Sequence, residues 1–382
     1  MKTKKKYVIT VFFLAIIYLF MISVIVRALT AETENKSKLS AMREAASESM
    51  TDNIFAKQPL LEFNGFISKI CGVKITVGEN TVAEIGDGFL TYTYDYADTS
   101  YQAKQTLKFN DFLERRDTRF LMMIPPFKVD GKDEKIISSL NDRTNIIADE
   151  FISNVQSEVE IFDMRRSVEK HGKEYLEMFF KTDHHWKPET GLEFTAKAAE
   201  VLRDDFGFDM NPSVYDKENF DVRVLKDYFL GSQGRKVTKG YAHPEDISII
   251  TPKEHTDFSV NIPKTGLDIS GDFETVFIDR EQIDVIDYYN LSPYNAYMHG
   301  DKPYIHIKNN LSGDGKRVLI LKDSYAAVMV PYLAMQLDEI DVIDLRYYDG
   351  NIREFIEKTA PDTVIMICHP ASLMDKNLFR MG

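Results

Sequence analysis

The chain has 382 residues, of which 44% are hydrophobic and 12% aromatic, and its formal net charge is −13. This length and apolar content allow one large or two ordinary domains and exclude a disordered protein. The acidic balance argues against nucleic acid as a partner, because phosphate backbones are bound by basic surfaces.

The first thirty residues predict a membrane anchor. Four lysines among the first six residues precede an uncharged apolar run, residues 7–26, which matches one bilayer crossing. The basic flank predicts a single-pass protein of the cell membrane with residues 31–382 outside the cytoplasm. A cleaved signal peptide is the alternative, but its apolar region is usually shorter and residues 28–30 (Ala-Leu-Thr) make a poor cleavage site. Since residues 1–30 hold five positive charges and no acid, the remainder carries −18.

Residues 31–59 are polar and acidic and are interpreted as a tether or a juxtamembrane helix, and residues 60–382 as the globular part. The two cysteines, Cys71 and Cys368, lie in apolar stretches. They are expected to be buried free thiols, although one disulfide is an alternative. Because there is no CxxC or Cys/His zinc pattern, no metal or cofactor is expected.

The globular part begins with a predicted strand at 72–77, a turn into a second strand at 85–92 and a helix at 103–116. The apolar run 120–124 is closed by two prolines and predicts a strand buried on both faces. A helix at 135–155 and a strand at 158–162 follow, and this order implies a right-handed parallel unit.

The second half predicts a doubly wound α/β sheet with an insertion. A helix is expected at 188–205, since Pro188 suits a first helical position and apolar residues follow at helical spacing. Residues 207–312 are interpreted as an insertion of small strands and loops. Strands then alternate with helices, at 317–321, 340–344 and 363–367 for the strands and 325–337 and 351–359 for the helices.

An acid and a base lie two residues apart just before the helix at 188–205. In extended backbone Asp183 and His185 share one side, while His184 turns to the other. An Asp that accepts a hydrogen bond from one imidazole nitrogen leaves the other free to take a proton from a nucleophile. A purely structural pair is the alternative. The spacing therefore predicts a general base and directs the search to a hydroxyl elsewhere.

Ser324 is the best candidate for that hydroxyl. It lies past the carboxyl end of a predicted buried strand and opens a helix, which is where ligands bind in open parallel sheets. The preceding Asp323 is expected to cap the helix or brace the turn rather than to react.

The motif at 182–186 (Thr-Asp-His-His-Trp) and the stretch at 319–326 (Leu-Ile-Leu-Lys-Asp-Ser-Tyr-Ala) resemble the bacterial DHHW family. That family resembles the periplasmic alginate O-acetyltransferases and, more distantly, the SGNH-type esterases. The resemblance implies a three-layer α/β/α, SGNH-hydrolase-like (flavodoxin-like) parallel sheet that is circularly permuted. By motif, it implies the roles of nucleophile, base and orienting acid for Ser324, His185 and Asp183.

Two departures from the pattern leave the oxyanion donors open. Lys322 replaces the glycine common in SGNH proteins, and Ala327 stands where asparagine is often found. A Gly/Ser-rich turn holds the candidates for a second donor or substrate contact, Gly231, Ser232 and Arg235, although an ordinary surface turn is the alternative. Trp186 is expected to support the site by packing, or else to form a wall for a sugar ring.

Together with the predicted anchor, the resemblance implies a membrane-anchored, extracytoplasmic O-acetyltransferase. Acetyl would pass through an acyl-serine to hydroxyls of an exported or cell-wall polysaccharide, and a membrane-bound O-acyltransferase would supply the acetyl group. An esterase or deacetylase of the same type, and a non-catalytic polysaccharide-binding assembly subunit, are the alternatives.

Overall fold

The computed structural model describes Tyr18, Ile22 and residues 57–76, 81–133, 140–312 and 315–381. The predicted membrane anchor lies outside the described residues apart from Tyr18 and Ile22, as does the predicted tether up to residue 56. Within the described part of the chain, every helix is too short or too polar to cross a bilayer. The chain divides into two compact units, 1–72 and 73–382, and the predicted division at residue 60 falls inside α3 (Lys57–Ile70).

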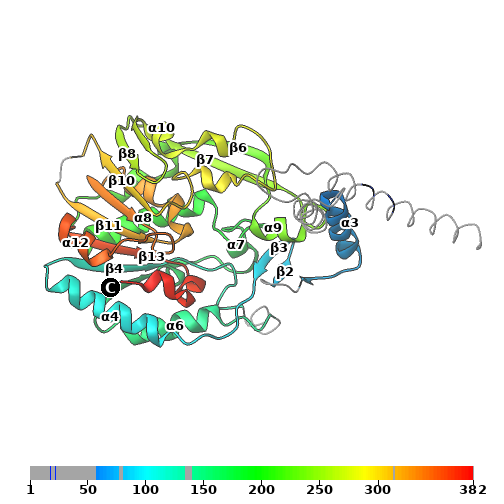
Figure 1. Ribbon diagram of the computed structural model, residues 1–382, viewed down its shortest axis with the longest axis horizontal. Coiled ribbons are helices and arrows are strands. Elements are labelled where there is room, and N and C mark those ends of the chain that lie inside the picture. The colour runs from blue at the N-terminus through cyan, green and yellow to red at the C-terminus, as the bar shows by residue number, and fades with distance from the viewer. Residues whose placement is uncertain are drawn as a thin grey trace, which may run out of the picture. The chain divides into compact units, whose positions relative to one another are not determined.

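The unit 73–382 is built on an eight-stranded sheet with the order β5-β4-β13-β11-β12-β10-β8-β9 (Figure 1). Neighbouring strands from β5 to β12 run parallel, and those from β12 through β10 and β8 to β9 run antiparallel. The strands are β4 (Arg119–Ile124), β5 (Glu160–Asp163), β8 (Phe258–Ile262), β9 (Leu267–Gly271), β10 (Tyr304–Asn309), β11 (Arg317–Lys322), β12 (Glu339–Ile343) and β13 (Thr363–Ile367).

The prediction of a parallel sheet is therefore right for five strands and wrong for three. The three antiparallel strands all come from the region 207–312, which extends the central sheet instead of lying outside it. Their sequences fit this position, since β9 alternates half-buried and exposed residues, as an antiparallel edge strand does. By contrast, β13 is buried along its whole length.

Helices cover both faces of the sheet. On one face, α4 (Ser100–Glu114), α6 (Thr144–Val155) and α12 (Ile352–Thr359) pack on alternate side chains of the parallel strands, such as Leu319 and Leu321 (Figure 1). On the other, α8 (Pro188–Asp204) packs over Val318 and Ile320. This alternation follows from the two-residue period of a strand.

Shorter elements complete the fold. Two small antiparallel sheets consist of β1 (Ile75–Thr76), β2 (Val82–Gly86) and β3 (Phe89–Tyr92), and of β6 (Phe220–Phe229) and β7 (Glu245–Pro252). The short α-helices are α7 (Gly172–Leu176), α9 (Ser232–Val237), α10 (Phe273–Phe277) and α11 (Val330–Leu333). The 3₁₀ helices are η1 (Met164–Ser167), η2 (Pro212–Tyr215), η3 (Lys217–Asn219), η4 (Arg280–Gln282), η5 (Pro293–Ala296), η6 (Ser324–Val328), η7 (Pro370–Met374) and η8 (Lys376–Phe379).

The helix predicted at 325–337 is instead two short helices, η6 and α11, that meet at Met329. Pro331 explains the break, because proline donates no backbone hydrogen bond and is tolerated only in the first turn of a helix. The turn that carries Ser324 is therefore a short 3₁₀ segment of its own.

The start of α8 lies against this 3₁₀ segment. Pro188 occupies the first turn, as predicted. At Gly191 the approach is so close that an added Cβ would lie 2.5 Å from a methyl carbon of Val328. Only glycine fits there without a shift, and the contact brings the residues just before α8 beside Ser324.

The two cysteines differ in exposure. Both are free thiols, but Cys368 is buried whereas Cys71 is exposed. The expectation of two buried thiols is wrong for Cys71, which follows the end of α3 and lies outside the hydrophobic core.

Candidate active site

Three side chains from distant parts of the sequence form a hydrogen-bonded row. The Nδ1 atom of His185 lies 2.5 Å from Oδ1 of Asp183, and its Nε2 atom lies 2.7 Å from Oγ of Ser324. Asp183 and His185 are buried and Ser324 is partly exposed. The contacts expected from the sequence are therefore present, and the Ser324 end of the row is partly exposed to solvent.

The row lies at the carboxyl edge of the parallel strands. Ser324 follows Lys322, the last residue of β11, and begins η6. Asp183 and His185 lie on an irregular segment between α7 and α8. This segment bends at residues 181–185 and is not the extended strand assumed from the sequence.

Side chains from elsewhere in the fold satisfy the backbone of this bent segment. The carboxylate of Glu245 accepts hydrogen bonds from the N–H groups of Lys181 and Thr182. The buried ammonium group of Lys128 donates to the carbonyl of Asp183, and the hydroxyl of Tyr325 donates to that of His184. The bend is thus held by residues from β7, from the loop after β4 and from η6.

The carboxylate of Asp183 is held in its charged form. Burial alone would raise its pKa, but the adjacent rings of His184 and His185 and a hydrogen bond from the N–H of Ser232 keep that pKa well below 3.8. The Ser232 N–H lies 2.6 Å from Oδ2. An ionised Asp183 holds the Nδ1 proton of His185, so Nε2 is the basic nitrogen that faces Ser324.

The turn at 231–232 braces Asp183, which argues against its predicted role as an oxyanion donor. The N–H of Gly231 donates to Oγ1 of Thr182 at 2.9 Å, and that of Ser232 donates to Asp183. Both amide donors are therefore engaged. Arg235 lies near the carbonyl of Tyr289, at 3.5 Å, and among the described contacts it makes none with the row.

Gly231 is needed for this approach. A Cβ atom added there would lie 2.2 Å from the Cβ of Asp183 and 2.6 Å from its Oδ2 atom. No real side chain tolerates such contacts, so any larger residue would move Asp183 or the turn.

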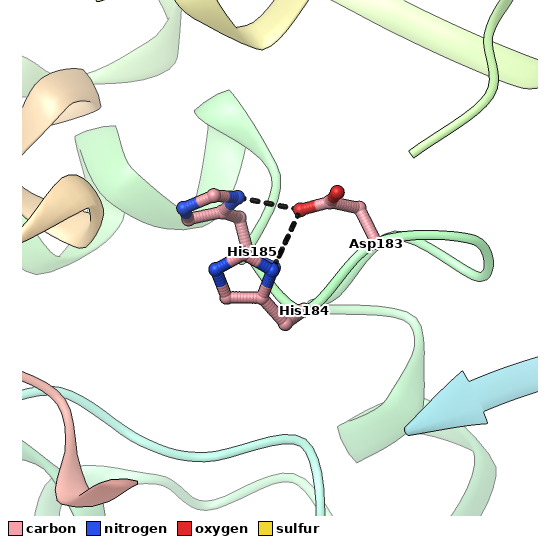
Figure 2. Close-up of side chains that lie close together, drawn as sticks. All are labelled: Asp183, His184 and His185. Atoms are coloured by element: carbon pink, nitrogen blue, oxygen red, sulfur yellow. Dashed lines mark hydrogen bonds and ion pairs between the residues drawn. The ribbon is translucent and has the colours of Figure 1, made fainter. Parts of the chain in front are cut away.

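Of the other two residues of the motif, Trp186 meets its first expectation and His184 does not. Trp186 is fully buried, stacks on Phe194 and donates its ring N–H to the carbonyl of Tyr325. It therefore supports the site by packing, and the alternative of a sugar-binding wall is wrong. His184 was expected to point away from His185, but the bend places the two ring centroids only 3.8 Å apart (Figure 2).

Sequence reasoning missed Tyr294, which lies in the inserted region. Its ring stacks flat on that of His185, and its hydroxyl lies 3.4 Å from the carbonyl oxygen of Ser324. No motif in the sequence indicates this contact, because it depends on how the insertion folds back over the sheet.

His369 was also missed, although a signal for it exists. It follows β13, the parallel neighbour of β11, and carboxyl ends of adjacent parallel strands meet at one edge. The ring atom Nδ1 of His369 lies 3.0 Å from Oδ2 of Asp323, and the backbone N–H of His369 donates to the same oxygen. Asp323 also accepts from the N–H of Tyr325, which confirms its predicted bracing and capping role.

Asp183, His184 and His185 also have the donor types of a metal site. One ligand atom from each residue lies within 4.8 Å of the other two. However, Nδ1 of His185 is hydrogen-bonded to the carboxylate, and a metal bound between them would displace that proton. The donor geometry therefore fits a hydrogen-bonded row better than a ligand set.

The fold and the row together define a mixed α/β protein with a Ser-His-Asp arrangement at the carboxyl edge of its sheet. The DHHW protein family matches residues 75–343, and the chain therefore belongs to that family. Among curated proteins there is no match in sequence.

Of three similar solved structures, the first two show the same fold. Bacillus cereus PatB1 is 18% identical over 80% of this chain and 100% of its own, with a TM-score of 0.67. A DHHW family protein from Eubacterium siraeum is 18% identical over 81% of this chain and 97% of its own, with a TM-score of 0.62. The O-acetyltransferase domain of Pseudomonas putida AlgJ is 12% identical over 79% and 93%, with a TM-score of 0.43.

Proposed function

We propose that the chain is an acyl-ester enzyme that transfers an acetyl group through an acyl-serine intermediate to hydroxyls of an exported or cell-wall polysaccharide. One observation carries the acyl chemistry, namely the continuous row from Asp183 through His185 to Ser324, with contacts of 2.5 and 2.7 Å. This is the geometry that a base-activated serine needs.

In the first half-reaction Oγ of Ser324 attacks the carbonyl carbon of the acyl donor, and Nε2 of His185 takes the hydroxyl proton. The tetrahedral intermediate collapses, the bond to the leaving alkoxide breaks, and His185 returns the proton to that alkoxide. An acetyl-Ser324 ester remains. Asp183 stays ionised and stabilises the charged imidazole while it exists.

In the second half-reaction a sugar hydroxyl attacks the acetyl-Ser324 ester and gives its proton to Nε2 of His185. The bond to Oγ breaks, and the proton passes to Oγ. The product is an acetylated sugar and the free serine. If water takes the place of the sugar, the same cycle is ester hydrolysis.

The position of the row supports an SGNH-like, three-layer and circularly permuted arrangement. Ser324 follows a central parallel strand, β11, and the segment with Asp183 and His185 precedes it in the chain. In the usual SGNH order the serine comes first. The choice of acetyl and polysaccharide rests on the resemblance of the motif at 182–186 to that of the alginate O-acetyltransferases.

The proposal places the site outside the cytoplasm on a single-pass anchor formed by residues 1–30. A transferase in that location needs acetyl groups from within the cell, so a membrane-bound O-acyltransferase is the proposed supplier. The net charge of −18 on residues 31–382 argues against strong binding to an anionic membrane surface, which makes the anchor the means of keeping the two enzymes together.

The experiment supplies p-nitrophenyl acetate with and without polysaccharide isolated from the cell envelope, and measures acetyl groups on the polymer alongside free acetate. The proposal predicts polymer acetylation that requires Ser324. Release of acetate with no acetylation of any envelope polymer would instead identify a hydrolase, and no Ser324-dependent turnover of any acyl ester would refute the enzyme.

A further inference from the structure

A second imidazole lies beside the base. The ring of His184 is tilted by 38° to that of His185, with the centroids 3.8 Å apart. Figure 2 shows that each ring turns one nitrogen, Nδ1, toward Asp183 and holds the other on the far side. For His185 that far nitrogen faces Ser324. The Nε2 atom of His184 therefore lies on the same side of the row as the reacting serine.

Of the two imidazoles, His184 is the more open to solvent. Its side chain is 23% exposed, whereas that of His185 is 10% exposed. The outer edge of His184 is therefore more accessible than that of His185.

A chain of hydrogen bonds fixes the proton on that outer edge. The hydroxyl of Tyr92 donates to Oγ of Ser232 at 3.2 Å, and this oxygen lies 3.1 Å from Nδ1 of His184. The carboxylate of Asp183 already accepts from the backbone N–H and Nδ1 of His185 and from the N–H of Ser232, and Nδ1 of His184 lies farther from it, at 3.5 Å. Because Ser232 accepts from Tyr92, its single hydroxyl hydrogen is available to donate to Nδ1 of His184. In this arrangement the single N–H proton of a neutral His184 ring is on Nε2.

The protonation states of both ends agree with this assignment. Burial, together with the adjacent His185 ring, holds the pKa of His184 well below 6.5, so the ring is neutral. Burial raises the pKa of Tyr92, so its phenol keeps its proton and remains a donor. With Nδ1 occupied and Nε2 protonated, His184 has no free basic nitrogen and cannot replace His185 as the base.

We propose that His184 donates a hydrogen bond from Nε2 to the carbonyl oxygen of the reacting acyl ester, and that Ser232 and Tyr92 are positioning residues that hold it in this tautomer. This inference rests on the proposed acyl-transfer function. It supplies the donor that the turn at 231–232 does not, because the amides of that turn are engaged with Thr182 and Asp183. A neutral N–H fixed in place stabilises the oxyanion of the tetrahedral intermediate.

The test compares three substitutions of His184. Glutamine puts an amide N–H close to the position of Nε2, asparagine puts one close to Nδ1, and leucine has neither. The expected result is that His184→Gln keeps kcat within about tenfold of the native value. His184→Asn and His184→Leu lose about 10²- to 10³-fold in kcat, the usual cost of one oxyanion donor, with little change in KM.

A merely structural role predicts the reverse order. If His184 only accepts a hydrogen bond from Ser232, asparagine serves better than glutamine. Greater activity of His184→Asn than of His184→Gln, or a native kcat in His184→Leu, overturns the proposal.

The hydrogen-bonded chain from Tyr92 through Ser232 to His184 allows a second measurement, which does not require variants of His184 to fold. Long-range proton–nitrogen NMR of histidine-labelled native protein reports which ring nitrogen carries the proton. The proposal predicts an Nε2–H tautomer for His184, and a shift to mixed tautomers in Tyr92→Phe and Ser232→Ala. An Nδ1–H tautomer in the native protein contradicts it.

The Ser324→Ala variant distinguishes a failure of the role proposed for His184 from a failure of the proposed acyl-serine function. If Ser324→Ala remains active, the proposed acyl-serine function itself fails. If Ser324→Ala is inactive while His184→Leu is fully active, only the role of His184 fails.

Discussion

The ring of Tyr294 lies flat on the imidazole of His185, with centroids 4.0 Å apart and planes 14° apart. Tyr294 belongs to η5 in the inserted region and is only 2% exposed. Tyr294 covers one face of the imidazole, while Asp183 and Ser324 are hydrogen-bonded to its two ring nitrogens. The insertion is therefore part of the site, and it fixes the orientation of the base.

Replacing Tyr294 tests this contact. Tyr294→Phe keeps the stacked ring and loses only the long 3.4 Å hydrogen bond, so kcat should stay within about threefold. Tyr294→Leu removes the stack, which is worth about 0.5–1.5 kcal/mol, and kcat should fall by roughly tenfold. Steady-state hydrolysis of p-nitrophenyl acetate measures both. Equal activity of the two variants would mean that stacking does not orient His185.

Gly231→Ala is expected to damage the site although the substitution adds a single carbon. The new Cβ would overlap the carboxylate of Asp183, so this side chain must shift away from His185. We expect kcat to fall by about 10²-fold or more, because a misplaced orienting group acts on the transition state.

A matched control is Gly131→Ala, where the nearest atom to an added Cβ is 3.1 Å away and belongs to the side chain of Asn145. That variant should keep near-native kcat. A fully active Gly231→Ala protein would show that the position of Asp183 is not critical.

Lys128 gives a prediction for pH. This lysine is fully buried, and burial lowers its pKa from 10.5 to about 7. Between those two values the unfolded chain binds more protons than the folded chain, so the free energy of unfolding rises with pH by up to about 1.4 kcal/mol per pH unit. Lys128→Met should lose this dependence.

Chemical denaturation of both proteins at several pH values between 7 and 10 measures the difference. The native protein should gain stability relative to Lys128→Met as the pH rises through this window. A constant difference across the window would mean that Lys128 has the same charge in the folded and unfolded chains.

The predicted anchor can be tested by replacing it with a signal peptide that is cleaved off. Replacing residues 1–30 with a cleavable signal should release a protein that still hydrolyses a small ester. Transfer to the native polymer should fall, because the acetyl supplier is no longer held at a high effective concentration. Undiminished transfer by the released protein would refute the need for the anchor.

Protease treatment of intact cells tests the topology separately. Residues 31–382 should be digested together with known outer domains. Protection of this region would contradict both the predicted topology and an exported substrate.

Much of the parallel sheet could be predicted because β4, β11 and β13 are continuous apolar runs with helical segments between them. The row could be predicted because Asp183 and His185 are close in sequence and Ser324 begins a strand-to-helix turn, although the extended backbone assumed for the acid and base is a bend. These signals act within a few residues of the chain.

The remainder depends on contacts between distant segments. The bend that turns His184 toward His185 is held by Glu245 and Lys128, and neither is near it in sequence. Likewise, β10 pairs with β12 by tertiary packing, which local alternation does not specify. Such features become visible only when the whole chain is folded.

The most direct test of the acyl-serine mechanism is mass spectrometry of the enzyme mixed rapidly with p-nitrophenyl acetate and quenched in acid. The mechanism predicts one added acetyl group on the peptide that contains Ser324. The acetylated peptide should be absent from Ser324→Ala and reduced in His185→Ala, since the base speeds attack by the hydroxyl. Turnover of the ester with no acetyl group on Ser324 at any time, or full activity in Ser324→Ala, would contradict it.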